Sequence, residues 1–208
     1  MRILDISRAL GVSTPAWPGD APLEISWTAL HDSGAAVSRL TLSPHLATHL
    51  DAPLHLDADG GDAATVPLAR CLGACQVVRL DGLQRPARPD DLPAGWSPDT
   101  PRILFASGSW PTGGALPERF AALSPHLVDH LADRGVVLIG VDTPSVDAAD
   151  ADGLPAHRRC LQRSVTILEG LDLEGIEAGL YTLIALPLRL VGGEASPVRA
   201  VLLSGFAI

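Results

Sequence analysis

The sequence predicts a mixed-sheet domain of the α/β class, with α+β as the alternative. Segments with the apolar patterns of strands outnumber those with helical periodicity. The helical segments do not alternate strictly with the strands, as they would in a doubly wound parallel sheet. The 208 residues are 47% hydrophobic and 19% charged, which supplies enough apolar material for one packed core. We therefore predict a single domain that spans residues 1–208.

Six segments have strand patterns, and in chain order they are Val37–Ser43, Gln76–Leu80, Arg102–Ala106, Val136–Val141, Tyr181–Leu190 and Val198–Leu203. The first two alternate apolar and polar residues, which is typical of half-buried strands. The next two are nearly continuous apolar runs, which indicate strands buried on both faces. We expect the last two to be antiparallel neighbours, because they are close in sequence.

Helical signals are fewer. Ser124 followed by proline predicts the start of a helix that runs to Arg134 and ends before Gly135. A second, shorter helix is expected over Leu116–Leu123. The proline-rich segment 86–101 is the nearest candidate for a domain boundary. Because strand-like segments lie on both sides of it, we interpret it as a surface excursion from one sheet.

The composition argues against several classes of partner. The formal net charge is -9, and the scattered basic residues are all arginine, so there is no basic stripe for a phosphate backbone. Nucleic acid is therefore not expected as a partner. We also expect no secretory signal and no membrane span, since no apolar run approaches about 20 residues. The odd set Cys71, Cys75 and Cys160 favours free thiols in a reducing compartment, and hence a cytoplasmic protein.

Four side chains that can bind a metal fall within eleven residues: His45, His49, Asp51 and His55. Imidazole and carboxylate are ligands that zinc prefers. A catalytic zinc site commonly uses three of them and leaves one position open. The spacing therefore predicts a metal site, and the alternative is a set of unrelated polar residues on a sheet edge.

This segment needs a bend to bind one ion. In a straight strand His45 and His49 would be roughly 13 Å apart, so a turn must fall between them, at Ala47. Pro44 and Pro53 keep the segment out of a helix interior or a central strand. We therefore expect a bent loop at the end of a strand.

A second group consists of His157 and Glu169, twelve residues apart. This pair completes a two-metal site if the fold brings it to Asp51, whose carboxylate has two oxygens and can bridge. The alternative interpretation is that His157, which precedes two arginines, caps the end of a helix.

Two other pairs have metal-like spacing. His126 and His130 lie opposite the apolar face of the first predicted helix, so we interpret them as a solvated surface. Cys71 and Cys75 lack further ligands for structural zinc, and core packing is the better interpretation.

The segment LSPHLATHLDAPLH resembles the signature of the cyclase-like metal hydrolases, H-x-G-T-H-x-D-x-P-x-H. Further segments resemble the bacterial kynurenine formamidases in the same order along nearly the whole chain. They are PAWPGD at 15–20, TLSPH at 41–45, GVDTPSVD at 140–147, ILEG at 167–170, and ALPLRL and ASPVRAVL at 185–202.

The resemblance implies a dimeric two-zinc hydrolase with a swivelling β/α/β-type fold. Such an enzyme releases formate from N-formyl-L-kynurenine during tryptophan degradation. By the same resemblance His45, His49 and Asp51 bind one zinc ion. Asp51, His157 and Glu169 bind the other, so Asp51 bridges the two.

The resemblance also implies that His55 is the catalytic acid/base and that Trp17 packs on the aromatic ring of the substrate. From the residues alone, His55 is also acceptable as a third histidine ligand. Trp17 is equally acceptable as an anchor of its loop on the core. Ala47 replaces the glycine of the family signature and would be strained if that position needs a positive φ.

Two other functions fit the same residues. One is a related amide or ring-opening hydrolase, for instance an isatin-hydrolase-like enzyme with the same zinc ligands and a different pocket. The other is a catalytically silent, metal-stabilised dimer that acts as a binding module. The presence of His55 beside a complete ligand set argues against a silent protein, which has no chemical need for an acid/base.

Overall fold

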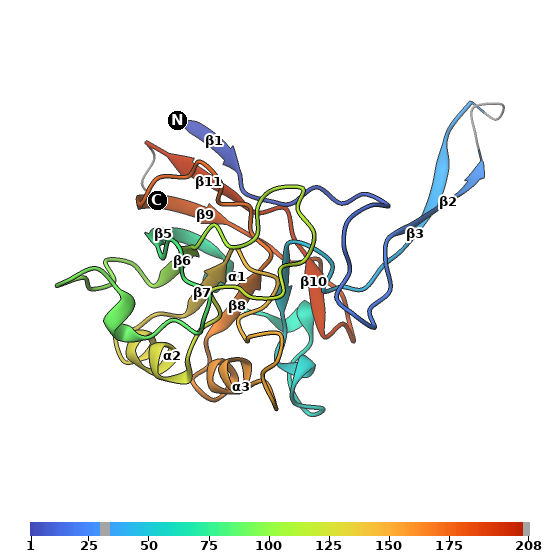
Figure 1. Ribbon diagram of the computed structural model, residues 1–208. Coiled ribbons are helices and arrows are strands. Elements are labelled where there is room, and N and C mark those ends of the chain that lie inside the picture. Colours follow the sequence, from blue (N-terminus) through green and yellow to red (C-terminus); the bar gives the residue numbers. More distant parts are fainter. Residues whose placement is uncertain (30–33, 206–208) are drawn as a thin grey trace.

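The computed structural model describes residues 1–29 and 34–205, and Figure 1 shows its arrangement. Within these residues, nine strands form one mixed sheet in the order β1-β11-β9-β5-β6-β7-β8-β4-β10. Their bounds are β1 Arg2–Asp5, β4 His49–Asp51, β5 Leu72–Arg79, β6 Arg102–Ala106, β7 Leu138–Val141, β8 Thr166–Glu169, β9 Gly179–Ile184, β10 Ala195–Pro197 and β11 Val201–Ser204. Strands β5 to β8 are parallel, and all the other pairs are antiparallel. The mixed-sheet α/β class is therefore confirmed.

The sheet confirms most of the strand predictions. β6 and β7 are buried along their whole length, as their continuous apolar sequences indicate. β5 and β6 are neighbours, so the proline-rich segment between them is an excursion from one sheet. β9 and β11 pair antiparallel, with Leu202 opposite Leu183.

The segment Val37–Ser43 differs from its prediction. β3 (Val37–Thr41) pairs only with β2 (Glu24–Ala29), in a separate two-stranded hairpin that projects from the molecule (Figure 1). All five residues of β3 are exposed, so the interpretation as a half-buried strand is wrong. The apolar side chains of Ile25, Trp27, Val37 and Leu40 in this hairpin are exposed.

The helices are short, and no helix in the described residues is long and apolar enough to cross a membrane. α2 (Pro125–Ala132) confirms the first helix prediction, and its N-cap Ser124 accepts a hydrogen bond from the backbone of Leu127. α2 and α3 (Pro155–Gln162) cover one face of the sheet (Figure 1). The remaining helices are α1 Leu68–Cys71 and the 3₁₀ turns η2 Pro53–His55, η3 Ala63–Thr65 and η4 Pro89–Asp91.

The second predicted helix, Leu116–Leu123, is wrong, because this segment is an irregular loop that bends at residues 118–119 and makes an isolated bridge at Leu123. The backbone N–H of Leu123 donates to the carbonyl of Val146 at 2.7 Å, and Ala87 donates to the carbonyl of Ala122 at 2.8 Å. These bonds to other segments satisfy the backbone groups that a helix would pair internally. The apolar run is buried at a junction between loops instead of forming a helical face.

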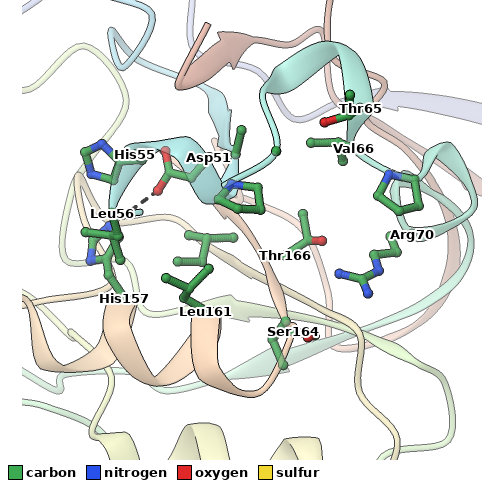
Figure 2. Close-up of a pocket in the computed structure, with 16 residues that line it drawn as sticks. Asp51, His55, Leu56, Thr65, Val66, Arg70, His157, Leu161, Ser164 and Thr166 are labelled. Carbon is green, nitrogen blue, oxygen red and sulfur yellow. Dashed lines mark ion pairs between the residues drawn. The ribbon is translucent and has the colours of Figure 1, made fainter. Parts of the chain in front are cut away.

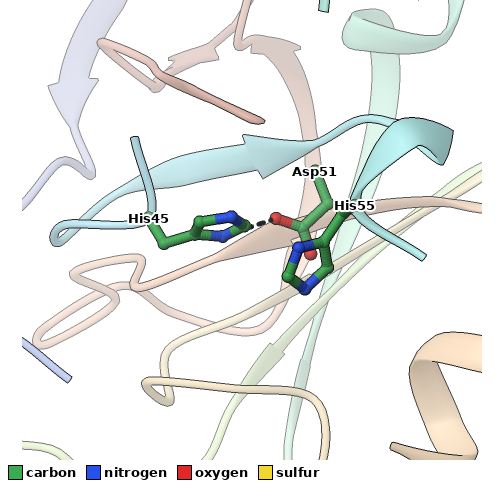
Figure 3. A group of neighbouring side chains, drawn as sticks. All are labelled: His45, Asp51 and His55. Carbon is green, nitrogen blue, oxygen red and sulfur yellow. Dashed lines mark ion pairs between the residues drawn. The ribbon is translucent and has the colours of Figure 1, made fainter. Parts of the chain in front are cut away.

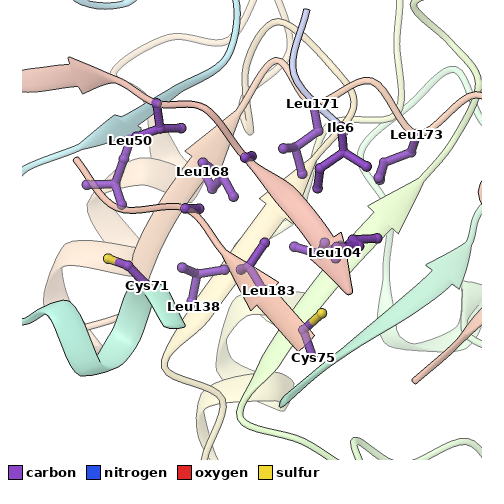
Figure 4. Close-up of a cluster of buried hydrophobic side chains, with 14 of the residues drawn as sticks. Ile6, Leu50, Cys71, Cys75, Leu104, Leu138, Leu168, Leu171, Leu173 and Leu183 are labelled. Carbon is purple, nitrogen blue, oxygen red and sulfur yellow. The ribbon is translucent and has the colours of Figure 1, made fainter. Parts of the chain in front are cut away.

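Two apolar clusters lie on opposite faces of the sheet. Alternate residues of β6 separate between them, with Phe105 beneath the helices and Leu104 on the other face. Figure 4 shows the cluster that contains Leu104, which also includes Leu50 of β4 and the free cysteines Cys71 and Cys75. This confirms core packing for the two cysteines. The same cluster contains Leu202 of β11, far from β4 in the strand order, so the sheet curls around it.

Candidate metal centre

The pairing of β4 with β8 brings together residues that are 120 positions apart. His49 lies directly opposite Glu169 in this antiparallel pair. Asp51 is two residues further along β4 and therefore shares the face of His49, while Leu50 points into the core. His49 Nε2 lies 3.2 Å from Glu169 Oε2 and 3.4 Å from Asp51 Oδ1. All three side chains are buried.

The backbone turns at Ala47, where the spacing of the histidines requires a bend, and Ala47 has a φ of 60°. This turn brings His45 back toward Asp51, with 3.2 Å between His45 Nδ1 and Asp51 Oδ1 (Figure 3). It also aims the Ala47 carbonyl at His49, whose Nδ1 lies 2.9 Å away. An Nδ1–H that donates to this carbonyl leaves Nε2 free to face the carboxylates.

The turn packs against Gly170, the residue after Glu169. Gly170 also has a positive φ, of 64°, and a Cβ at this position would lie 2.6 Å from the carbonyl carbon of Ala47. The hydroxyl of Thr48 donates to the carbonyl of Gly170 at 2.5 Å. Glycine is therefore required here, because any side chain would displace the carbonyl that orients His49.

His157 reaches the same place from the first turn of α3. One carboxylate, that of Asp147, accepts from the backbone N–H groups of Ala156 and His157 at 2.8 and 3.0 Å. It also accepts from His157 Nδ1 at 2.7 Å. His157 Nε2 then lies 3.3 Å from Asp51 Oδ2 and 3.3 Å from Glu169 Oε1. His157 is thus a buried partner of both carboxylates, and Asp147 caps the helix.

His55 stands at the edge of this cluster. It ends η2, which begins two residues after Asp51. Its ring centroid lies 4.4 Å from that of His45 and 5.7 Å from that of His157. All three rings border a cavity of about 190 Å³, which is also lined by His49, Glu169, Asp20, Pro144, Ser145, Leu154 and Trp17. The structure therefore brings Trp17 beside the cluster as well.

Burial and charge act against each other in the cluster. Burial disfavours the charged form of His49, but Asp51 and Glu169 outweigh it and raise its pKa to about 10. Burial likewise opposes the charge on Asp51, yet the surrounding histidines hold its pKa well below the usual range. His55 is different, because burial is the main influence on it and lowers its pKa. His55 is therefore neutral near pH 7. In the metal-free centre His49 is protonated at this pH.

The residues present fit a metal centre. His49 Nε2 and both carboxylate oxygens of Asp51 are buried and make no hydrogen bond of good geometry in the described structure, although ion-pair contacts of 3.2–3.4 Å surround them. Such atoms are costly unless something else binds them. Two groups of donor atoms lie within 4.8 Å of one another: His49 with Asp51 and Glu169, and His45 with Asp51 and His55. Nitrogen and carboxylate oxygen donors suit zinc and its neighbours.

Asp51 belongs to both groups, as a bridging ligand would. The division of the ligands between two zinc ions remains a prediction. The closeness of His55 to His45 and Asp51 leaves both of its roles open, as ligand and as acid/base.

Two residues that shape the centre were assigned no role from the sequence. Asp147 lies in the GVDTPSVD segment, but only its distance to His157 reveals its function. Asp147 lies eight residues before Pro155, too far for the local N-cap pattern, so no sequence signal indicated this role. Gly170 directly follows Glu169, and no local pattern indicates that Ala47 lies against it.

Comparison with known proteins gives the family and the fold of the chain. The family model described as "Putative cyclase" matches residues 4–148. The solved structure of a "potential metal-dependent hydrolase with cyclase activity" superposes with a TM-score of 0.83 at 27% identity, covering 97% of this chain and 96% of its own. A "predicted metal-dependent hydrolase from Bacillus stearothermophilus" gives 0.83 at 26% identity, covering 97% of each chain.

Isatin hydrolase A from Labrenzia aggregata has a TM-score of 0.79 at 21% identity, covering 97% of this chain and 93% of that one, which shows a shared fold. The family model covers more than half of the sequence, including the first ligand segment and the loop that carries Asp147. The chain belongs to the Cyclase family.

Proposed function

We propose that this protein is a zinc-dependent amidohydrolase that converts N-formyl-L-kynurenine to L-kynurenine and formate, in the degradation of tryptophan. The observation that carries the proposal is the cluster of His45, His49, Asp51, His157 and Glu169, whose closely spaced nitrogen and oxygen atoms fit metal ions. The two relatives with 26% and 27% identity, named as metal-dependent hydrolases, support hydrolysis as the reaction class. The formamidase-like segments of the sequence support the substrate.

We propose two zinc ions per subunit, with Asp51 between them. When bound, zinc polarises a carbonyl oxygen and lowers the pKa of water to about 7. The protein supplies fixed ligands, because the Ala47 carbonyl and the Asp147 carboxylate hold the Nδ1 atoms of His49 and His157. Both Nε2 atoms then face the carboxylates without a conformational change.

Hydrolysis of a formamide forms a bond from a water oxygen to the formyl carbon and breaks the bond from that carbon to nitrogen. A proton must leave the water, and the departing aniline nitrogen must gain one. In the proposal the neutral imidazole of His55 accepts the first proton and delivers the second. Trp17 lines the same cavity, and its indole would stack on the aryl ring.

The proposal is tested by metal analysis and turnover on the same preparation. We expect about two zinc ions per chain and formate release from N-formyl-L-kynurenine. Elemental analysis that gives one ion or fewer in fully active protein would exclude the two-metal site. Full zinc occupancy without turnover of any amide would favour a silent binding module.

The second candidate function is a ring-opening hydrolase. The observation that favours it is the fold shared with isatin hydrolases, including one solved with the product analogue thioisatinate. Isatin is a neutral bicyclic amide, so it differs from formyl-kynurenine in having no carboxylate. Parallel assays with the two substrates separate these enzymes, and a preference for isatin would replace the formamidase proposal.

We further propose that the protein is a cytoplasmic homodimer. The free, buried cysteines support a reducing compartment. The β2–β3 hairpin supports association, because Ile25, Trp27, Val37 and Leu40 are exposed on it. An isolated two-stranded hairpin is marginally stable in water, so a second copy that covers this face would stabilise it. A monomeric mass by light scattering at micromolar concentration would refute the dimer.

A further inference from the structure

A second, larger cavity lies on another side of His55. Its volume is about 300 Å³, and Figure 2 shows Asp51, His55 and His157 at one end of it and Arg70 at the other. Between them the lining is mixed, with the apolar Val66 and Leu161 beside Thr65, Ser164 and Thr166. His55 and His157 also line the cavity that contains Trp17. The two cavities therefore meet at these two imidazoles.

Arg70 is the only cationic side chain apart from the histidines that lines this cavity in the described structure. Several other arginines pair with nearby aspartates, among them Arg79, Arg85, Arg163 and Arg199. No ion pair to Arg70 is found among the described residues, and Asp51, at the far end, is the sole acid in the lining. The guanidinium thus presents a positive charge to this cavity with no acid beside it.

The backbone that carries Arg70 is held firmly. Arg70 lies in α1, and carbonyl groups of this helix accept hydrogen bonds from the buried guanidinium of Arg102. Arg102 donates to the carbonyls of Ala69 and Arg70, the latter at 2.7 Å, and to that of Ala74 at 3.1 Å. A charged side chain on a fixed backbone is suited to selecting a ligand, because the backbone loses little conformational entropy when the ligand binds.

We propose that this cavity is a subsite for the amino-acid end of the substrate, and that Arg70 binds its carboxylate. The proposal rests on the amidohydrolase function and names the substrate class: aryl amides that carry a carboxylate on a side chain beside the amide nitrogen. With the aryl ring on Trp17 and the amide nitrogen at His55, a substituent on the neighbouring ring carbon starts at His55. From there the substituent can extend into the second cavity, and Arg70 lies at the far end of that cavity.

Arginine suits this role because its planar guanidinium donates two parallel hydrogen bonds to a carboxylate. Loss of a hydrogen bond to a charged group weakens binding by roughly 10- to 100-fold. The subsite therefore predicts that aryl formamides with a carboxylate are preferred over those without one, and that this preference depends on Arg70.

The experiment compares zinc-loaded wild-type protein with Arg70→Gln, Arg70→Lys and the control Arg134→Gln. Arg134 is an exposed arginine that follows α2, so its substitution makes the same change in charge elsewhere. Steady-state rates are measured with N-formyl-L-kynurenine and with neutral formanilide. Binding of L-kynurenine is measured by calorimetry, which requires no turnover. Thermal unfolding confirms that each variant is folded.

We expect Arg70→Gln to lower kcat/KM for N-formyl-L-kynurenine by about 10- to 100-fold, mainly through KM, with formanilide unchanged within about twofold. Arg70→Lys should recover part of the loss, and Arg134→Gln should match wild type. Equal losses on both substrates, or no loss on either, would overturn the subsite. If wild type hydrolyses neither substrate, the amidohydrolase proposal fails. Kynurenine binding then decides the subsite alone, which stands if Arg70→Gln weakens binding and falls if it does not.

Discussion

The two halves of the candidate metal centre orient their histidines by different means. The first half consists of His45, His49 and Asp51. Here the Ala47 carbonyl accepts a hydrogen bond from Nδ1 of His49, and a backbone turn with positive φ orients that carbonyl. The second half consists of His157 and Glu169, which face Asp51. Here the carboxylate of Asp147 accepts a hydrogen bond from Nδ1 of His157 and also caps the helix that carries His157. The first half depends on backbone conformation and the second on a side chain. Mutations should therefore affect them differently.

The largest effect should come from removing the metal, which both halves serve. We expect chelation to abolish hydrolysis while unfolding stays cooperative, because the two apolar clusters do not involve the ligands. Activity and thermal unfolding measured before and after dialysis against a chelator test this. Loss of cooperative unfolding in the metal-free protein would show that the centre is structural.

His55 lies beside His45 and Asp51 of the first half, and its replacement tests whether it serves as an acid/base or as a ligand. His55→Ala should reduce kcat by roughly 10²- to 10⁴-fold with unchanged zinc content, the range of general acid–base groups. His126→Ala, on the exposed face of α2, is the control. If His55 is instead a ligand, zinc content should fall and added zinc should restore part of the rate. Normal zinc and normal turnover would refute both roles.

The sequence revealed the two halves to different degrees. The first could be predicted from spacing, because its donors lie within eleven residues and the required turn falls at Ala47, where φ is 60°. The second depended on family resemblance, since α3 was not predicted and only the β4–β8 register places Glu169 beside His49. The partner of Gly170 and the role of Asp147 are long-range contacts. They have no periodic signal in the chain.

The pH dependence of zinc binding should reflect the protons that hold the metal-free centre together. The raised pKa of His49, about 10, means that its proton stabilises the metal-free fold fully below its ordinary pKa of 6.5. That contribution is lost as the pH rises toward 10. Zinc must displace this proton, so affinity should rise by about tenfold per pH unit for each proton released. Calorimetry at pH 7 in buffers of different ionisation enthalpy counts these protons, and a count of zero would contradict the assignment.

Asp147→Asn separates the halves directly. An amide nitrogen that faces His157 Nδ1 would favour the wrong tautomer, and the ligand would lose a charged partner. We expect zinc affinity to fall by about 10- to 100-fold, with one ion affected more than the other. Asp150→Asn, an exposed acid with the same change in charge, should leave affinity unchanged. Wild-type affinity in Asp147→Asn would mean that packing alone orients the ring.

The smallest effect is expected at the backbone of the first half, in Ala47→Gly. Glycine relieves left-handed strain of about 1–2 kcal/mol. It also removes a buried methyl group worth about 0.8 kcal/mol and adds about 0.5–1 kcal/mol of chain entropy to the unfolded state. These contributions nearly cancel, so the free energy of unfolding should change by less than about 1 kcal/mol. Zinc affinity should not change, since the carbonyl that orients His49 remains.

Gly170→Ala is the contrasting variant, because its Cβ would collide with the backbone carbonyl of Ala47, which has no side-chain freedom to escape. We expect several kcal/mol of destabilisation there, about the size of a severe backbone clash, together with weaker zinc binding. Denaturant unfolding and zinc titration of both variants test the contrast. A gain above about 2 kcal/mol in Ala47→Gly would show that alanine stores more strain in this turn than its φ implies. A tolerated Gly170→Ala would show that the turn can move without loss of the ligand it orients.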